Sequence, residues 1–327
     1  MTSPRTLTYA QALNEALVQE LERDDCVVVF GEDVGVFGGV FGVTKGLQDR
    51  FGPQRVFDTP LSETLIVGAA VGAAMTGLRP VAELQYADFV SIAMDELFNK
   101  AARWRFAHGS RHTVPMVVRA PEGARGGAGP EHSQSVGGMF AAAVGLHVLM
   151  PSTPADAKGL LTAAIRSDDP VLFLEHKALY SKRGEVPEGD HVIPIGVADI
   201  KRTGTDVTVV AFGSMVLRAL EAAEVVATDG IEVEVVDPRG VRPLDTVTIL
   251  ESVERTGRLI VVHEAPAHGG PGAEVVAVVA EQALDVLEAP IRRVTMPDVL
   301  PPQSVHLERM LVPGPDDVVA AIRDVCA

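Results

Sequence analysis

The feature that most constrains the fold of this chain is a regular alternation of short apolar runs with longer segments of helical periodicity. Leu13, Leu17 and Leu21 recur along one helical face, and the run Cys-Val-Val-Val-Phe at 26–30 follows as a buried strand. The same pairing recurs as far as residue 284, with one interruption. Strands that alternate with helices form mostly parallel sheets covered on both faces, so we predict an α/β fold.

The alternation is interrupted near the middle of the chain. Residues 181–196 contain Pro187, Pro194 and several glycines, which are typical of a boundary. A chain of 327 residues is long enough for about two domains. We therefore place a first domain at 1–185 and a second at 196–327. The main elements that we predict are strands at 81–84, 115–119, 171–174, 207–212, 233–236 and 259–263, and helices at 61–76, 89–104, 154–168, 214–227, 245–254 and 273–284.

Composition and charge exclude several classes of function. No apolar run reaches the roughly 18 residues of a membrane-spanning helix, and residues 1–8 lack the apolar core of a secretory signal. The two cysteines, Cys26 and Cys326, have no metal-ligand spacing and indicate a reducing compartment, hence the cytoplasm. The net charge of −16 argues against nucleic acid and anionic membranes as partners. It suits a basic protein partner, or it serves solubility alone.

Several common catalytic motifs are missing from the sequence. It has no GxGxxG opening a helix after the first strand, no GxxxxGKS/T loop, no HExxH and no GxSxG. Polar residues do occur where strands end and helices begin, which is where doubly wound sheets bind ligands. They lie in four segments: 31–33 (GED), 58–63 (DTPLSE), 83–89 (ELQYADF) and 131–135 (EHSQS).

The longer motifs identify a family by resemblance. The chain resembles the beta subunit of the decarboxylase component of 2-oxo acid dehydrogenase complexes, a group that includes pyruvate, branched-chain and acetoin dehydrogenases. The resemblance covers essentially the whole chain and implies a doubly wound, transketolase-like pyrimidine-binding domain followed by a transketolase C-terminal-like α/β domain for dimerisation and partner docking. The matching segments are GEDVGVFGGVFGVTKGL (31–47), RVFDTPLSETLIVGAAVGAAMTGLRPVAEL (55–84), EHSQS (131–135), PSTPADAKGLL (151–161) and GRLIVVHEA (257–265).

The resemblance also implies a cofactor shared between two chains. In this family thiamine diphosphate lies between subunits, where the beta chain binds the aminopyrimidine and the alpha chain binds the diphosphate through Mg²⁺. The alpha chain does so with a Gly-Asp-Gly motif, and this sequence contains none. We therefore expect an α2β2 heterotetramer that is active only with its alpha subunit, and we assign no metal ligand to this chain.

Glu63 aligns with the glutamate that activates the cofactor in this family. Its carboxyl group would hydrogen-bond the pyrimidine ring nitrogen and so promote loss of the proton from carbon 2 of the thiazolium. That role implies a partly desolvated carboxyl group with a raised pKa. Without the flanking motif, the same residue would be explained by the helix dipole, which favours an acidic residue in a first turn.

Four further residues align with positions that line the pyrimidine pocket. Phe89 would stack on the aminopyrimidine, and Gln85, Glu32 and Leu61 would surround it. From the local sequence alone, Phe89 would be a core aromatic residue and Gln85 a polar group at a strand end. Glu32 would be a loop carboxylate and Leu61 a core leucine. Tyr86 lies in the same segment and receives no role.

Among the histidines, His132 aligns with the family's His-Ser-Gln motif. Beside the thiazolium it would transfer a proton or orient the lipoyl group during reductive acylation; the alternative is a loop histidine that bonds the backbone. His176 and His263 follow strands, and we expect structural or interface roles for both.

Members of the family can also carry a structural K⁺. That ion would lie near Met116 and Val117 and the turn Asp168-Asp169, and backbone carbonyl groups would be its main ligands.

The resemblance predicts the reaction class: decarboxylation of a 2-oxo acid and reductive acylation of a lipoyl group carried by an acyltransferase. The segments 86–89 (YADF) and 97–106 (LFNKAARWRF) look most like the acetoin or bacterial pyruvate branch. Residues 265–268 and 300–310 depart from the family pattern, which puts docking of a standard acyltransferase in doubt. The alternatives are a split-subunit, thiamine-dependent carboligase and a noncatalytic partner subunit; intact Glu63, Gln85 and His132 argue against the second.

Overall fold

A computed structural model describes residues Arg5–Ala327 and shows two compact α/β units, which confirms the predicted fold class. The first unit contains the chain up to Glu122 together with Ala142–Ile195, and the second contains Gly123–Ala141 and Gly196–Ala327. The segment Gly123–Ala141 therefore makes its contacts within the second unit. Residues 1–4, on which part of the expectation about a secretory signal depends, lie outside the described residues.

The first unit is built on parallel strands in the order β6-β7-β5-β4-β2-β3. Next to the edge strand β3, Val29 of β2 pairs with Val56 on one side and Val81 on the other, and all three are fully buried. Such burial on both faces explains why these strands are continuous apolar runs. The strands are β2 (Val27–Gly31), β3 (Val56–Asp58), β4 (Arg79–Glu83), β5 (Val117–Glu122), β6 (His147–Leu149) and β7 (Val171–His176); β1 (Arg5–Thr8) and β8 (Arg183–Val186) form a separate antiparallel pair.

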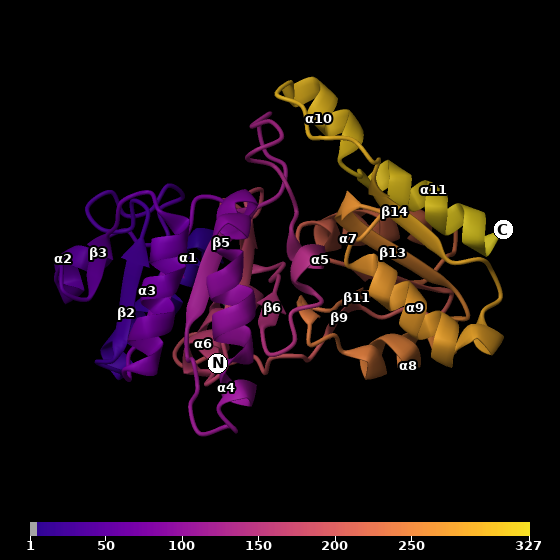
Figure 1. The fold of residues 1–327 in the computed structure, drawn as a ribbon. Coiled ribbons are helices and arrows are strands. Elements are labelled where there is room, and N and C mark those ends of the chain that lie inside the picture. Colours follow the sequence, from indigo (N-terminus) through magenta and orange to yellow (C-terminus); the bar gives the residue numbers. More distant parts are fainter. Residues whose placement is uncertain (1–4) are drawn as a thin grey trace. The chain divides into compact units, whose positions relative to one another are not determined.

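Helices cover both faces of this sheet (Figure 1). Helix α1 (Tyr9–Arg23) packs against α6 (Pro154–Arg166) on one face, and α3 (Glu63–Met75) packs against residues 87–101 on the other. The short helices α2 (Leu47–Phe51) and α4 (Ala102–Ala107) complete the unit. Crossover connections between parallel strands are right-handed. A connection that runs one way along the sheet therefore lies on one face, and a connection that runs the other way lies on the opposite face.

The helix predicted at 89–104 is not one regular α-helix. A 3₁₀ helix at Ala87–Ala93 is followed by a π-helical stretch at Asp95–Ala101, before α4 begins. The buried residues Ala93, Leu97 and Ala101 are four positions apart, whereas an α-helix has 3.6 residues per turn. A wider π turn keeps such a row facing the core, and π-helical turns recur near functional sites.

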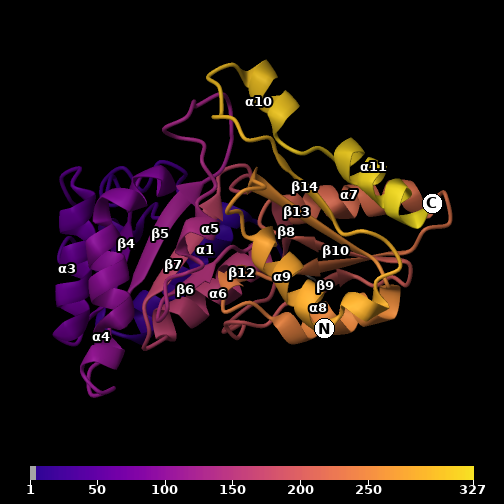
Figure 2. The same ribbon diagram turned by 45° about the vertical axis from the view of Figure 1, so that its right-hand side comes forward.

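The second unit has the strand order β14-β13-β10-β11-β9, parallel except for the antiparallel edge strand β9 (Figure 2). Helices α7 and α11 pack together on one face and α8 and α9 on the other. No helix within residues 5–327 is long and apolar enough to cross a membrane. The elements are β9 (Asp199–Arg202), β10 (Val207–Ala211), β11 (Val233–Asp237), β12 (Gly240–Arg242), β13 (Leu259–Pro266), β14 (Arg292–Met296), α5 (Gly137–Phe140), α7 (Met215–Ala227), α8 (Thr246–Thr256), α9 (Gly272–Gln282), a 3₁₀ turn at Leu284–Val286, α10 (Val305–Leu311) and α11 (Pro315–Cys326).

Candidate active site

The candidate site lies at the carboxyl ends of β2 and β4 in the first unit. The chain leaves β2 towards β3 on one side and later returns to β4 on the other, so these neighbouring strands form the topological switch point at which open α/β sheets bind ligands. Glu32 follows β2 and Gln85 follows β4. The backbone N–H of Gln85 donates to Glu32 Oε2 at 3.1 Å, and the N–H of Glu32 donates to the carbonyl oxygen of Glu83 at 3.2 Å. The two predicted residues are thus joined directly.

Glu32 is a buried carboxyl group with an unusual pKa. Only 2% of the residue is exposed, and burial together with repulsion from Glu63 raises its pKa to about 7, against the hydrogen bond from the Gln85 N–H. Its Oε1 is buried and accepts no hydrogen bond from residues 5–327. Near neutral pH this group can therefore either donate a proton to a ligand or accept one. The loop carboxylate considered as an alternative would be solvated, which Glu32 is not.

Glu63 reaches the same place from the connection between β3 and α3. It is the first residue of α3, is half-buried, and is close enough to Glu32 to raise that residue's pKa. Leu61 just before it is 80% exposed, so it is not the core leucine of the local alternative. Asp58, at the end of β3, accepts hydrogen bonds from the N–H groups of Gly35 and Val36 at 2.6 and 3.4 Å, which fixes the glycine-rich loop beside Glu32.

Behind Gln85 lies a buried ionic cluster that the sequence did not reveal. The Gln85 amide nitrogen donates to Glu83 Oε1 at 2.6 Å, and Arg119 bonds Glu83 Oε2 at 2.5 Å and both oxygens of Glu175 at 2.6 and 2.8 Å. The Tyr180 hydroxyl donates to Glu175 at 2.7 Å. A carboxylate only accepts hydrogen bonds, so the contact with Glu83 fixes the amide nitrogen inward. Gln85 Oε1, buried and without a partner in the described chain, is left to accept a hydrogen bond from a ligand.

Aromatic residues lie next to these polar groups. Phe89 is half-buried in the 3₁₀ helix Ala87–Ala93, where its N–H donates to the carbonyl oxygen of Tyr86 at 2.9 Å. The Lys177 ammonium lies 4.7 Å from the centroid of the Tyr86 ring, and Phe41 stacks on Tyr180 with ring centroids 4.4 Å apart. Burial and the nearby Glu32 carboxylate raise the pKa of the Tyr86 hydroxyl, so this aromatic residue lies beside the carboxyl groups.

The histidines occur in loops and strands of both units. His132 is half-buried in the loop between β5 and α5, which belongs to the second unit. The side-chain oxygen of the next residue, Ser133, is buried and has no partner within residues 5–327. His176 and His263 are both buried within strands; burial lowers the pKa of His263 to about 4, which keeps it neutral.

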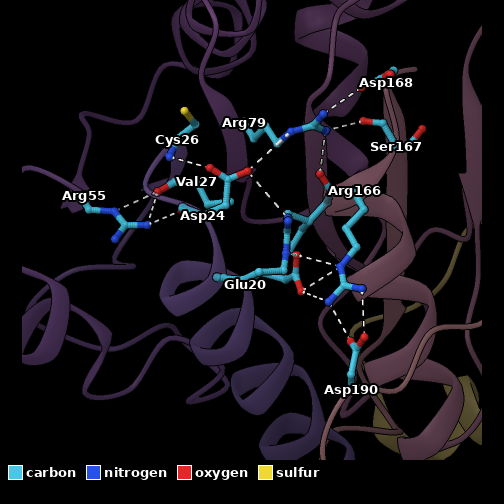
Figure 3. A network of polar contacts seen from close by, with 12 residues as sticks. Glu20, Asp24, Cys26, Val27, Arg55, Arg79, Arg166, Ser167, Asp168 and Asp190 are labelled. Atoms are coloured by element: carbon cyan, nitrogen blue, oxygen red, sulfur yellow. Dashed lines mark hydrogen bonds and ion pairs between the residues drawn. The ribbon is translucent and has the colours of Figure 1, made fainter.

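Arg79 contacts one part of the region where the cation site is expected, the turn at Asp168 (Figure 3). The Arg79 guanidinium donates to the carbonyl oxygens of Ile165 and Ser167 at 3.1 and 2.9 Å and to the Asp168 carboxylate at 2.8 Å. The carbonyl oxygen of Met116 accepts a backbone N–H at 2.9 Å. Of the expected site, the Asp168 carboxylate and the Met116 carbonyl oxygen thus each have a partner within the protein. Nor do the described residues contain a group of three or more His, Cys, Asp or Glu side chains suited to a metal.

Comparison with known proteins identifies the two domains. Residues 5–182 match the pyrimidine-binding domain of transketolase, and residues 196–318 match the transketolase C-terminal domain. Among solved structures, a split-gene transketolase described as an inactive β4 tetramer has a TM-score of 0.79 at 24% identity, over 98% of each chain. The fold and the switch-point site thus define a protein of the transketolase class.

Relatives of much higher identity narrow this class. The 2-oxoisovalerate dehydrogenase subunit beta of Bacillus subtilis (strain 168) is 47% identical over 98% of each chain, and the pyruvate dehydrogenase E1 component subunit beta of the same organism is 49% identical over 98% of each. The acetoin:2,6-dichlorophenolindophenol oxidoreductase subunit beta of Cupriavidus necator is 47% identical over 98% of this chain and 97% of its own. The chain belongs to this family of dehydrogenase E1 beta subunits, as its motifs predicted.

Burial of Arg119 leads to a first prediction. Replacing Arg119 with Met leaves Glu83 and Glu175 buried without their cation, which we expect to cost about 3–5 kcal/mol in the free energy of unfolding. Arg105→Met is the matched control, because Arg105 pairs with Asp169 at the surface and such pairs contribute about 0–1 kcal/mol. Urea unfolding of the isolated chain measures both. Equal effects of the two substitutions would show that the cluster does not stabilise the unit.

The raised pKa of Glu32 leads to a second prediction. In the unfolded chain this carboxyl group loses its proton near its ordinary pKa of 4.5, whereas in the folded chain it keeps the proton up to about pH 7. The folded state is therefore penalised progressively between these values and fully above pH 7. We expect Glu32→Gln to stabilise the chain by about 1–3 kcal/mol at pH 8 and to make little difference at pH 4.5. Glu251→Gln, at an exposed position, is the control.

The measurement is urea unfolding of the three proteins at pH 4.5, 6, 7 and 8. A stability difference between Glu32→Gln and the parent chain that stays constant across this range contradicts the assignment.

Proposed function

We propose that this chain is the beta subunit of a thiamine diphosphate-dependent 2-oxo acid dehydrogenase. The observation that carries the proposal is the grouping of Glu32, Glu63 and Gln85 at the switch point of a member of this family. Glu32 Oε1 and Gln85 Oε1 are buried without partners in the described chain, which suits atoms that bind the polar edge of an aminopyrimidine. The residues present therefore fit this cofactor.

Thiamine diphosphate, when bound, supplies the carbon nucleophile that cleaves the bond beside the substrate carbonyl. In our proposal the Glu63 carboxyl group holds the proton at the ring nitrogen of the aminopyrimidine. Glu32 and Gln85 bind the polar edge of the same ring beside it. Phe89 stacks on the face of the ring, and Leu61 excludes water from it.

The proposal includes an alpha subunit as a necessary partner. The sequence has no Gly-Asp-Gly motif, and the relatives are all named as beta subunits. Helix α3 also exposes Leu65 and carries Gly68 and Gly72, which would let another chain approach closely. We propose an α2β2 heterotetramer in the cytoplasm in which the alpha subunit holds the diphosphate through Mg²⁺. We also propose a structural K⁺ near Met116, Val117 and the turn Asp168-Asp169.

For the second half-reaction we propose that His132 assists transfer of the acyl group to a lipoyl-bearing acyltransferase. A half-buried histidine next to an unpartnered buried hydroxyl, Ser133, can orient a sulfur nucleophile or move its proton. The relatives favour this reaction over the carboligase alternative, because those at 45–49% identity are named as dehydrogenase or oxidoreductase subunits. The sequence segments 86–89 and 97–106 place acetoin or pyruvate ahead of branched-chain substrates.

The role of Glu63 is tested by reconstitution with an alpha subunit. Because Gln cannot exchange a proton with the pyrimidine ring, we expect Glu63→Gln to lower cofactor-dependent decarboxylation by about 10²–10⁴-fold. Glu251→Gln removes a charge at an exposed site and should leave the rate unchanged. Release of CO₂ from pyruvate measures the effect for both, with acetaldehyde release from acetoin as the parallel assay. Near-normal turnover by Glu63→Gln would contradict the proposed role of Glu63.

The role of His132 predicts a different kinetic pattern. Since His132 is proposed to act after decarboxylation, His132→Ala should lower acyl transfer to the lipoyl group by about 100-fold. Decarboxylation measured with an artificial electron acceptor should change by less than about tenfold, as should both steps in the exposed control His112→Ala. Acyl transfer that is unchanged in His132→Ala contradicts the proposed role.

A further inference from the structure

The loop that carries His132 is closed on itself by backbone hydrogen bonds. The N–H of Gly123 donates to the carbonyl oxygen of Gln134 at 2.9 Å, and the N–H of His132 donates to that of Gly129 at 3.3 Å. The Gln134 amide nitrogen donates to the carbonyl oxygen of Pro130 at 3.0 Å. Residues 123–135 form this loop, the histidine loop. Its many glycines provide few side chains that could anchor it.

Two buried carboxyl groups of the second unit anchor the histidine loop from outside. The N–H of Ala124 donates to Oε1 of Glu264, near the end of β13, at 2.5 Å. The N–H of Gly127 donates to Oε2 of Glu308, in α10, at 2.8 Å. Only 4% of Glu264 and 5% of Glu308 is exposed. Burial of a carboxyl group is costly, and a hydrogen bond from a backbone N–H to a carboxylate is stronger than one between neutral groups.

The segment before α10 packs directly on the same loop, and both views show them side by side (Figures 1 and 2). Gly127 has φ +72°, and a Cβ atom there would lie 2.4 Å from the carbonyl oxygen of Gln303. A Cβ atom at Gly129 would lie 2.8 Å from the Gln303 side chain. The histidine loop therefore fits this segment in one position. Gln303 and Glu308 both lie in the part of the chain, 300–310, whose sequence departs from the family pattern.

We propose that Glu264 and Glu308 are positioning residues that fix the histidine loop and thereby set the orientation of His132. The inference rests on the proposed function only for the role of His132 itself; the anchoring of the loop is independent of it. It also gives the altered segment 300–310 a function inside its own unit. Sequence changes there would then tune the acyl-transfer half-reaction, whether or not they change docking of an acyltransferase.

The experiment compares Glu308→Ala with Glu308→Gln, because glutamine keeps an oxygen that can accept the Gly127 N–H. Cleavage by trypsin after Arg125, which is exposed in the loop, and hydrogen exchange over 123–135 report on the loop without any cofactor. We expect Glu308→Ala to speed loop cleavage by about tenfold, and Glu308→Gln to stay within about threefold of the parent chain. Glu251→Ala, which removes an exposed carboxyl group from α8, should have no effect. Gly127→Ala disturbs the same contact from the loop side and should match Glu308→Ala.

In the reconstituted enzyme, Glu308→Ala should lower acyl transfer more than decarboxylation, and Glu308→Gln should restore most of it. Unchanged loop cleavage in both Glu308→Ala and Gly127→Ala overturns the anchoring proposal, whatever the enzyme does. A loosened loop with unchanged acyl transfer overturns the positioning role. If His132→Ala also leaves acyl transfer unchanged, it is the proposed function of His132 that fails, while the anchoring itself stands.

Discussion

The guanidinium group of Arg119 bonds Glu83 and Glu175, and these three side chains come from the neighbouring strands β4, β5 and β7. Each is almost completely buried. Apolar side chains could fill this space at lower cost, since burying charges costs more than their attraction commonly returns. The ion pairs instead fix the orientation of Gln85. One oxygen of Glu83 accepts a hydrogen bond from the Gln85 amide and the other accepts one from Arg119, so the Gln85 side chain can face the candidate site in one way only.

The same cluster shapes the electrostatics of the site. Two carboxyl groups share one guanidinium group, and burial together with repulsion from Glu175 raises the pKa of Glu83 despite the contact with Arg119. That negative charge, with Glu63 nearby, adds to the burial that brings the pKa of Glu32 to about 7. A cofactor that carries a positively charged ring would meet an environment already biased towards negative charge. A neutral carboxyl group at Glu32 also keeps a proton available where a pyrimidine nitrogen would bind.

Much of this could be predicted from sequence and some could not, for definite reasons. The alternation of apolar strands with helices determines the sheets, and the polar segments after β2 and β4 marked the site because carboxyl ends of parallel strands meet at one edge. Arg119 and Glu175 sit inside apolar strands, where pairing between strands far apart in sequence decides whether a charge is satisfied. The exposure of Leu61 and the π-helical stretch Asp95–Ala101 likewise depend on which residues pack against them, and the order of residues along the chain does not reveal those partners.

The position of the charges also changes what the net charge of −16 means. The sequence suggested a basic partner or simple solubility, both of which assume that the excess acid lies on the surface. Among the described residues, however, ten buried Asp and Glu side chains stand against three buried Arg and Lys side chains. Several of these acids, such as Glu32, Glu264 and Glu308, accept hydrogen bonds from backbone N–H groups at loops rather than pairing only with cations. Glycine-rich loops offer exposed N–H groups and few side chains, so a buried carboxylate is an effective anchor for them. Part of the excess of acidic residues therefore serves to hold loops in place. Because these residues are buried, the net charge is a weaker argument for a basic partner.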